Sequence, residues 1–334
     1  MMKKSENNSG IYRRLFKEIR KHLAPSLALV DAIADTLHIS TDAAYRRMSG
    51  KTLLDIEEAT TLCNHFHIPF DLSKGVKDVY SLNCAYRPVD VSIQGDYLSH
   101  ALFLSQHFEE LRSVSDSSIL MSAIDIPLFH LVYHKELIFF KLYTWANSVY
   151  DYRGSLDDFI KELDTPEFTR CHQKICDDYE FIPSAEIWTD HTLDTTTRLI
   201  NYYLDMETFT SKEFPLLLCE GLLSILTRFQ QWVEKGEKGN GAASFQFYLS
   251  EIDFEGTYVL LKQSEQKLCM VRQFTINSLT ILDEDYCTEA DNYLSKLAQR
   301  SILLCGGSEK ERIKFFNTQR EKVQDLMEKI NHSF

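Results

Sequence analysis

The chain has 334 residues, of which 44% are hydrophobic and 25% are charged, so its composition excludes an intrinsically disordered protein and is that of a soluble globular one. Its length indicates two domains or three. The formal net charge of −13 at pH 7, taken alone, argues against a protein that binds nucleic acid.

The charge is distributed unevenly along the chain. Residues 1–52 contain ten Lys and Arg against five acidic residues, a net charge of +5, which leaves −18 for the other 282 residues. A basic N-terminal segment on an acidic body is the distribution expected of a DNA-binding module joined to a separate domain. The alternative is a set of solvated basic helices with no ligand.

The eight cysteines are scattered and include no C-x-x-C pair. Several lie within apolar segments, which indicates buried thiols in a reducing compartment rather than a disulfide framework. The N-terminal sequence MMKKSENNSG lacks the apolar stretch of a signal peptide, and no uncharged run reaches transmembrane length. We therefore expect a cytoplasmic protein that does not enter a membrane.

The first 70 residues predict a series of short helices. Hydrophobic residues repeat every three or four positions, and Gly50 and Pro69 mark the ends of the third and fourth segments. Only three residues, 38–40, separate the second helix from the third. The helices are expected over 11–23, 27–37, 41–49 and 53–66.

Two helices joined by so short a link form a helix-turn-helix pattern. Ala34 is small where the two helices must cross, Ile39 fills the turn, and Ser40 is a favourable N-cap for the second helix of the pair. Four residues of that helix are spaced to share one outward face: Thr41, Asp42, Tyr45 and Arg46.

These outward side chains have the chemistry of base and phosphate contacts. Arg46 can pair with guanine, or with a phosphate, through two N–H groups. Tyr45 can contact a thymine methyl group or a phosphate, and the helix N-terminus favours a phosphate nearby. Asp42 can accept a hydrogen bond from cytosine N4, or it can instead cap the helix or orient Arg46.

Residues 29–72, with the sequence LVDAIADTLHISTDAAYRRMSGKTLLDIEEATTLCNHFHIPFDL, resemble the lambda-repressor-like (Cro/repressor-type) helix-turn-helix family. The positions that match the family in order and spacing are Ile33-Ala34, Leu37, Ile39, Ser40, Gly50 and the segment 56–68. The resemblance implies a DNA-binding domain in which five residues, carried over by position, face DNA: Ser40, Thr41, Asp42, Tyr45 and Arg46.

Three positions depart from the family pattern. His38 occupies the turn position usually held by glycine, although histidine tolerates a positive φ less well. Arg47 stands where the family usually has an apolar residue, so we expect its stem to lie along the protein while its charge reaches a phosphate. Met48 replaces an acidic residue. Lys51, directly after Gly50, completes the expected DNA-binding set.

The resemblance extends to the whole chain through three segments, YRRMSGK, IPSAEIW and SEKERIKFFN. The first lies within residues 29–72, and the other two lie beyond them. With them, the chain resembles a group of bacterial regulators that have this N-terminal domain and a long C-terminal half. That group implies no particular ligand.

The N-terminal domain is expected to cover residues 1–72, and the mixed polar residues 73–94 are expected to form a linker. Helical periodicity dominates residues 95–235, and a glycine-rich link follows. Residues 242–334 alternate hydrophobic and polar side chains over short segments before two final helices. The expected fold is therefore mainly α: a lambda-repressor-like domain, then a large mostly helical region packed with a small antiparallel sheet near the C-terminus (α+β).

These patterns predict a sequence-specific DNA-binding transcriptional regulator and not an enzyme. A single such domain binds weakly, so we expect a homodimer that reads two half-sites on double-stranded DNA, with the final helix, 309–331, in its interface. An unidentified small molecule or peptide is the candidate effector of the C-terminal half. The alternative is a protein-interaction scaffold whose helical N-terminal domain binds a protein partner.

Neither a cofactor nor a metal ion is expected. Cys63, His65 and His67 are spaced by two, which on a helix places them on opposite sides, and no fourth ligand lies nearby in the sequence. The signatures G-x-S-x-G and H-E-x-x-H are absent. An enzyme with its site in residues 95–305 is a third hypothesis, for which the sequence nominates no residue.

Overall fold

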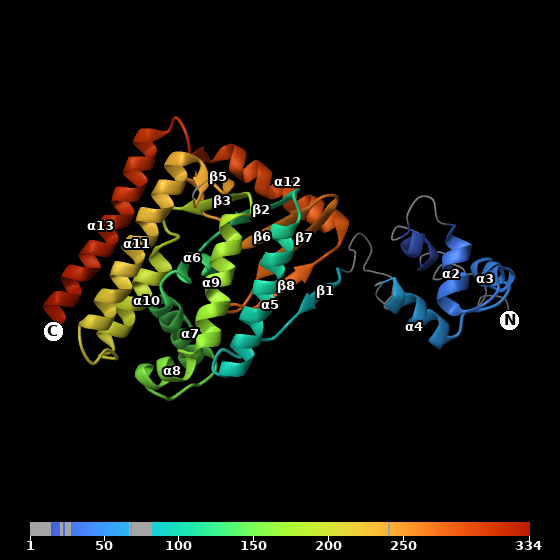
Figure 1. The fold of residues 1–334 in the computed structure, drawn as a ribbon, viewed down its shortest axis with the longest axis horizontal. Helices are drawn as coiled ribbons and strands as arrows, with labels where there is room; N and C mark the ends of the chain where they lie inside the picture. Colours follow the sequence, from blue (N-terminus) through green and yellow to red (C-terminus); the bar gives the residue numbers. More distant parts are fainter. Residues whose placement is uncertain (1–14, 21–22, 24–27, 67, 69–81, 240) are drawn as a thin grey trace. The chain divides into compact units, whose positions relative to one another are not determined.

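The structure is a computed structural model that describes residues 15–20, 23, 28–66, 68, 82–239 and 241–334. The chain divides into two compact units (Figure 1), residues 1–83 and 84–334, which we call the head and the body. Each unit is described by itself.

The described part of the head consists of helices around one small core. Residues 15–20 are helical. Three further helices follow: α2 (Leu29–Leu37), α3 (Thr41–Met48) and α4 (Ile56–His65). Apolar side chains from all four segments are buried together, among them Ile19, Ile33, Ala44 and Leu62. Because these contacts join segments that are close in the sequence, the head is held together by short-range packing.

The body is built on a sheet that has nine strands within the described residues. The strand order is β1-β8-β7-β6-β2-β3-β5-β4, and β9 also pairs with β5. The strands are β1 (Cys84–Tyr86), β2 (Ser117–Ser122), β3 (Ser184–Thr189), β4 (Glu237–Lys238), β5 (Ala243–Ser250), β6 (Tyr258–Gln263), β7 (Gln266–Arg272), β8 (Ser278–Ile281) and β9 (Ile302–Leu303).

The sheet is mixed. Its centre, β2-β3-β5, is parallel. On one side β6, β7, β8 and β1 continue it as antiparallel neighbours, and on the other β4 and β9 pair antiparallel with β5. Parallel neighbours need long crossover connections, and helices supply them here. The chain passes through four helices between β2 and β3, and through two helices between β3 and β5.

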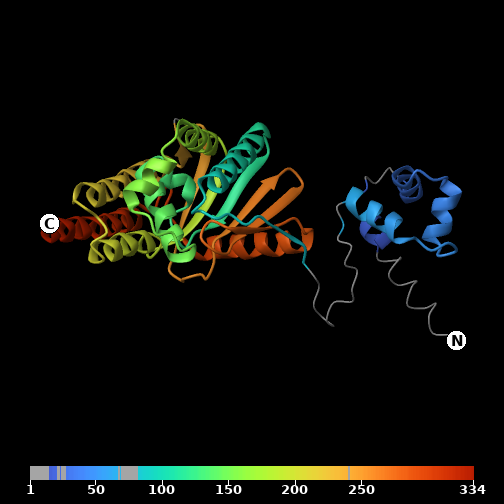
Figure 2. The same cartoon turned by 90° about the horizontal axis from the view of Figure 1, so that it is seen from below.

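Helices cover both faces of the sheet. The body helices are α5 (Gln94–Ser113), α6 (Leu128–Leu131), α7 (Lys135–Val149), α8 (Leu156–Leu163), α9 (Pro166–Glu180), α10 (Asp194–Asp205), α11 (Glu213–Lys235), α12 (Glu284–Arg300) and α13 (Glu309–Ser333). Trp188 of β3 belongs to the large core with α11, whereas its neighbour Ile187 points to the other face and packs with α12. Figure 2 shows α12 and α5 on opposite sides of the strands.

The predicted fold class is wrong for the body. We expected a mostly helical region before a small antiparallel sheet, but β2 and β3 lie within residues 95–235 and form the parallel centre of a large mixed sheet. Both strands are six residues long and buried on both faces. Such strands show no hydrophobic alternation, so periodicity does not separate them from short pieces of helix. The strand β1 also lies within the segment 73–94.

The final helix, α13, uses its apolar side inside the body. Phe316, Val323 and Ile330 are fully buried in the large core, and α13 packs along α11 and α10. Much of the apolar side of the helix that we expected in a dimer interface is therefore covered within the body, whereas Ile313 is 46% exposed. Among the described residues, no helix has the length and apolar character needed to cross a membrane.

Candidate nucleic-acid interface

A tight turn fixes the angle between α2 and α3. The N–H of His38 donates to the carbonyl of Asp35 at 3.3 Å, and the N–H of Ile39 donates to that of Ala34 at 3.0 Å. These two bonds are the pattern of a Schellman motif, which needs a left-handed residue directly after the helix. His38 is that residue, with φ 54° and ψ 43°. It therefore adopts the positive φ for which glycine is the usual choice, at a conformational cost of about 1 kcal/mol.

Two interactions fix the rotation of α3 about its axis. At its start, the Ser40 hydroxyl accepts a hydrogen bond from the N–H of Ala43 at 3.3 Å, so Ser40 caps the helix. In its middle, Ala44 is completely buried against the head core. With this side of α3 turned inward, the opposite side faces solvent. The outward residues are Thr41, Asp42, Tyr45 and Arg46.

Tyr45 is the most informative of these residues. Its side chain is 60% exposed, although tyrosine usually covers its ring. Arg46 is also exposed, and among the described residues no carboxylate lies within ion-pair distance of it. The ring and the guanidinium are adjacent on one face, so an aromatic contact and a charged, forked hydrogen-bond donor are available together to a ligand.

Arg47 is placed differently from its neighbour. Its Nε donates to both carboxylate oxygens of Glu58 at 2.9 Å, its Nη2 donates to Oε1 at 2.5 Å, and each of the two side chains is 18% exposed. Its Nη1 also donates to the carbonyl of Ala43 at 3.3 Å. The hydrogen bond with Glu58 raises the pKa of Arg47. Arg47 therefore ties α3 to α4, and its charge is matched by a carboxylate instead of being free for a phosphate.

Glu58 is a residue that our reading of the sequence missed. Its N–H donates to the Asp55 carboxylate at 2.8 Å, and its own carboxylate accepts from the Asp55 N–H at 3.3 Å, which is a capping box at the start of α4. A sequence signal was present, since an aspartate followed three residues later by a glutamate is a known helix-start pattern. Glu58 thus caps α4 and neutralises Arg47.

The end of α3 repeats the motif that ends α2. The N–H of Gly50 donates to the carbonyl of Arg47 at 3.0 Å, and the N–H of Lys51 donates to that of Arg46 at 2.9 Å. Gly50 has φ 72°, and no atom lies within 4 Å of the place where a Cβ would stand, so backbone conformation alone calls for glycine. Lys51 follows directly, exposed and without a carboxylate partner among the described residues.

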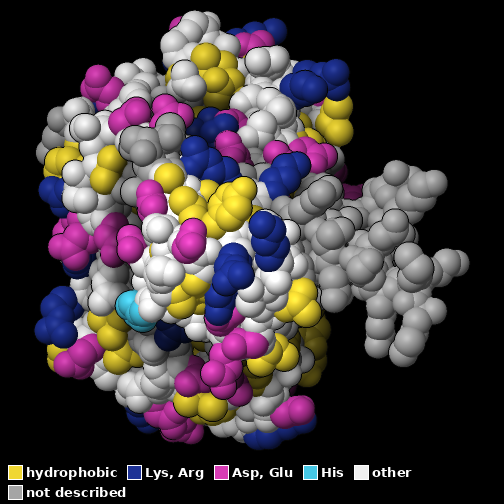
Figure 3. All heavy atoms as spheres, turned by 90° about the vertical axis from the view of Figure 1, so that its right-hand side faces the viewer, with side chains coloured by type: hydrophobic (Ala, Val, Ile, Leu, Met, Phe, Trp, Pro, Cys, Tyr) yellow, Lys and Arg dark blue, Asp and Glu magenta, His cyan; other side chains and the backbone are white. Residues whose placement is uncertain are grey.

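The surface around this face is mixed in character. Leu53 and Ile56, in the segment after Lys51, are 57% and 72% exposed. On the face of the molecule drawn in Figure 3, Lys and Arg side chains are interspersed with hydrophobic and acidic ones. The surface is therefore not a broad basic patch, and a nucleic-acid contact would depend on individual cations, chiefly Arg46 and Lys51.

The candidate metal ligands are not assembled in the described part of the chain. Cys63 is buried in the head core, His65 is exposed, and His67 lies outside the described residues. No group of three or more His, Cys, Asp or Glu side chains in the described ranges is arranged to hold a metal ion. Comparison of the chain with protein-family models, with curated proteins and with solved structures gave no match.

Proposed function

We propose that this chain is a sequence-specific transcriptional regulator that inserts α3 of the head into the major groove of double-stranded DNA. The observation that carries the proposal is the outward face of α3, where Tyr45 and Arg46 are exposed together while Arg47 is held by Glu58. An α-helix fits the major groove, and an unpaired arginine there can read guanine O6 and N7 through two hydrogen bonds. Thr41 and Lys51 at the two ends of the helix suit phosphates.

Arg46 and Lys51, the two exposed cations of this face, would by themselves bind DNA phosphates only weakly. A protein of this kind reaches useful affinity by presenting two heads to two half-sites, so we propose that the chain acts as a homodimer. We place this activity in the cytoplasm. The support for that location is that all eight cysteines are unpaired thiols, as in proteins of reducing compartments.

Selection of genomic DNA by the purified full chain at two salt concentrations, followed by sequencing, tests the proposal. Enrichment of a sequence with two half-sites is the expected result. On that sequence, Arg46→Ala should weaken binding by ~1–3 kcal/mol, which is about a 5- to 150-fold loss of affinity. Arg300→Ala is the matched control, because Arg300 is an exposed arginine of α12. Equal losses in the two variants, or no enriched sequence, would contradict the proposal.

A second candidate function is a head that binds a protein. The exposed apolar side chains Leu53 and Ile56 favour it, because large hydrophobic residues at such exposure suit a protein contact. The salt dependence of binding distinguishes the two functions. The affinity for DNA falls steeply as the salt concentration rises, because binding to DNA releases counterions. Ile56→Ser should abolish binding of a protein partner and leave DNA binding unchanged if α3 is the reading helix.

A further inference from the structure

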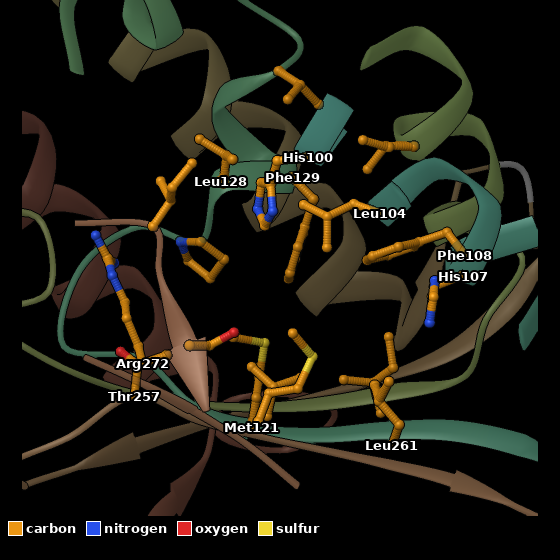
Figure 4. A pocket seen from close by; sticks show the side chains of 18 of the residues that line it. His100, Leu104, His107, Phe108, Met121, Leu128, Phe129, Thr257, Leu261 and Arg272 are labelled. Atoms are coloured by element: carbon orange, nitrogen blue, oxygen red, sulfur yellow. The ribbon is translucent and has the colours of Figure 1, made fainter. Parts of the chain in front are cut away.

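The body contains a cavity of about 180 Å³ between α5 and the antiparallel half of the sheet. Figure 4 shows its walls: His100, Leu104 and Phe108 come from α5 on one side, and Met121 and Leu261 come from strands on the other. A cavity of ~150 Å³ lined by hydrophobic side chains accepts one benzene ring. This cavity therefore has room for one ring, or a short chain, and a few further atoms.

The charged residues in the cavity wall do not cancel. Three of the lining residues have ionisable side chains of the strongly acidic or basic kind: Asp125, Lys141 and Arg272. The Lys141 ammonium donates to Asp125 Oδ2 at 2.6 Å, and both side chains are buried, so these two charges neutralise each other. Thr196 and the N–H of Ile126 donate to the other oxygen, Oδ1. The Asp125 carboxylate is thus fully engaged, and Arg272 leaves a net charge of +1 at this end of the cavity.

Arg272 has hydrogen-bonding capacity to spare. Its Nε donates to the carbonyl of Thr275 at 2.5 Å, which fixes the guanidinium. Its Nη1 lies 3.9 Å from Asp125 Oδ2, too far for a hydrogen bond, and among the described residues neither Nη1 nor Nη2 donates to any acceptor. The guanidinium also lies 5.4 Å from the centre of the Trp145 ring. A fixed guanidinium with two free nitrogens is the geometry that pairs with a carboxylate.

His100 is a buried polar residue in the wall of the cavity. Its side chain is 8% exposed and lines the cavity from α5, and its Nδ1 is buried without a hydrogen-bond partner. Burial lowers the pKa of His100 to about 4, so the ring is neutral and offers a donor and an acceptor. Its Nδ1 thus adds a buried polar atom without a hydrogen-bond partner to a wall that is otherwise mostly apolar.

We propose that this cavity binds a small organic monoanion: a carboxylate on one aromatic ring or a short aliphatic chain. The carboxylate pairs with the free Nη1 and Nη2 of Arg272. The apolar part lies between α5 and the strands β2, β6 and β7. A cationic ligand is disfavoured, because the one carboxylate in the wall is already paired with Lys141. The site lies entirely within the body, so the proposal does not depend on DNA binding by the head.

Calorimetric titration of the full chain with phenylacetate, in the absence of DNA, tests the proposal. Phenylacetate should bind with a Kd below about 1 mM and at least tenfold more tightly than phenylacetamide, which has nearly the same shape and no charge. Arg272→Gln should remove that preference. Arg300→Gln, on the helix that covers the opposite face of the sheet, should keep it. No binding of phenylacetate, equal affinity for the acid and the amide, or an unchanged preference in Arg272→Gln would each overturn the assignment.

The fluorescence of Trp145 provides a test that needs no change to Arg272. Trp145 lines the cavity next to the guanidinium, whereas the other two tryptophans, Trp188 and Trp232, are buried in the core. Phenylacetate should change the emission of the wild-type protein and should not change that of Trp145→Phe. The same emission change in both proteins would place the ligand elsewhere and refute the site, even if Arg272→Gln did not fold.

Discussion

Replacing Arg47 with methionine should destabilise the head without removing a phosphate contact. An exposed ion pair contributes ~0–1 kcal/mol, whereas breaking a fully buried pair costs ~3–5 kcal/mol. The Arg47–Glu58 pair lies between these limits, since both side chains are 18% exposed and the arginine donates through both Nε and Nη2. Arg47→Met keeps most of the aliphatic stem, so its expected cost is about 1–3 kcal/mol.

Native-state hydrogen exchange in the full chain can measure this loss within the head itself. The buried amides of α3 should exchange about 5- to 150-fold faster in Arg47→Met, because their protection reports the free energy of local opening. Glu58→Gln completes a double-mutant cycle, since glutamine keeps an oxygen that can accept from the N–H of Asp55. The coupling energy of the pair should be about 1–3 kcal/mol.

The opposite outcome would refute this assignment of Arg47. A phosphate contact contributes ~0.9 to the slope of log affinity against log salt. If Arg47→Met leaves the exchange of α3 unchanged but lowers that slope by ~0.9, then its charge reaches DNA, as we inferred from the sequence. If α3 opens more readily and the slope stays the same, the ion pair with Glu58 is its role.

Three further predictions concern backbone conformation, a buried charge and pH. Gly50→Ala should lower the stability of the head by about 1–2 kcal/mol, because the φ angle of Gly50 is 72°. If the amide hydrogens of α3 exchange at the same rate in this variant as in the wild-type protein, the positive φ carries no cost for alanine. Asp125→Asn should destabilise the body by about 3–5 kcal/mol in urea unfolding, because the Lys141 side chain is only 1% exposed and loses its carboxylate partner. A much smaller change would mean that Lys141 is neutral. Burial lowers the pKa of His172 from 6.5 to about 4, so the folded body binds a proton at His172 less tightly than the unfolded chain does. About 3 kcal/mol of the free energy of unfolding should therefore be lost as the pH falls from 6.5 to 4. His172→Gln should remove this share of the pH dependence of urea unfolding and exposed His332→Gln should not, whereas identical profiles for the two variants would contradict the assignment.

The helices of the head were predictable because their signals are local. Periodicity and end signals gave 27–37, 41–49 and 53–66, against Leu29–Leu37, Thr41–Met48 and Ile56–His65 in the structure. A cap such as Ser40 and a left-handed glycine such as Gly50 act within four or five residues of the chain. The same local reading identified His38 as the turn residue, and the structure gives it a positive φ.

The sheet and the cavity of the body were not predictable in this way. β2 and β3 are short and buried on both faces, so each looks like a fragment of an apolar helix. The cavity draws Asp125 from the segment after β2, Lys141 from α7 and Arg272 from β7, and no sequence spacing connects them. Their proximity follows from the order of strands in the sheet, which depends on pairings across the whole body.

The same strand order separates the folding of the two units in time. Cys84 of β1 pairs with Ile281 of β8, so the antiparallel half of the sheet cannot be completed until the ribosome has passed residue 281. Synthesis of the chain between these strands takes roughly 10–40 s at ~5–20 residues per second. The described contacts of the head join segments that are close in the sequence, and such contacts form in far less time. We therefore expect each nascent chain to carry a folded head for roughly 10–40 s before its body is complete, so that any influence of a ligand in the body begins only after that interval.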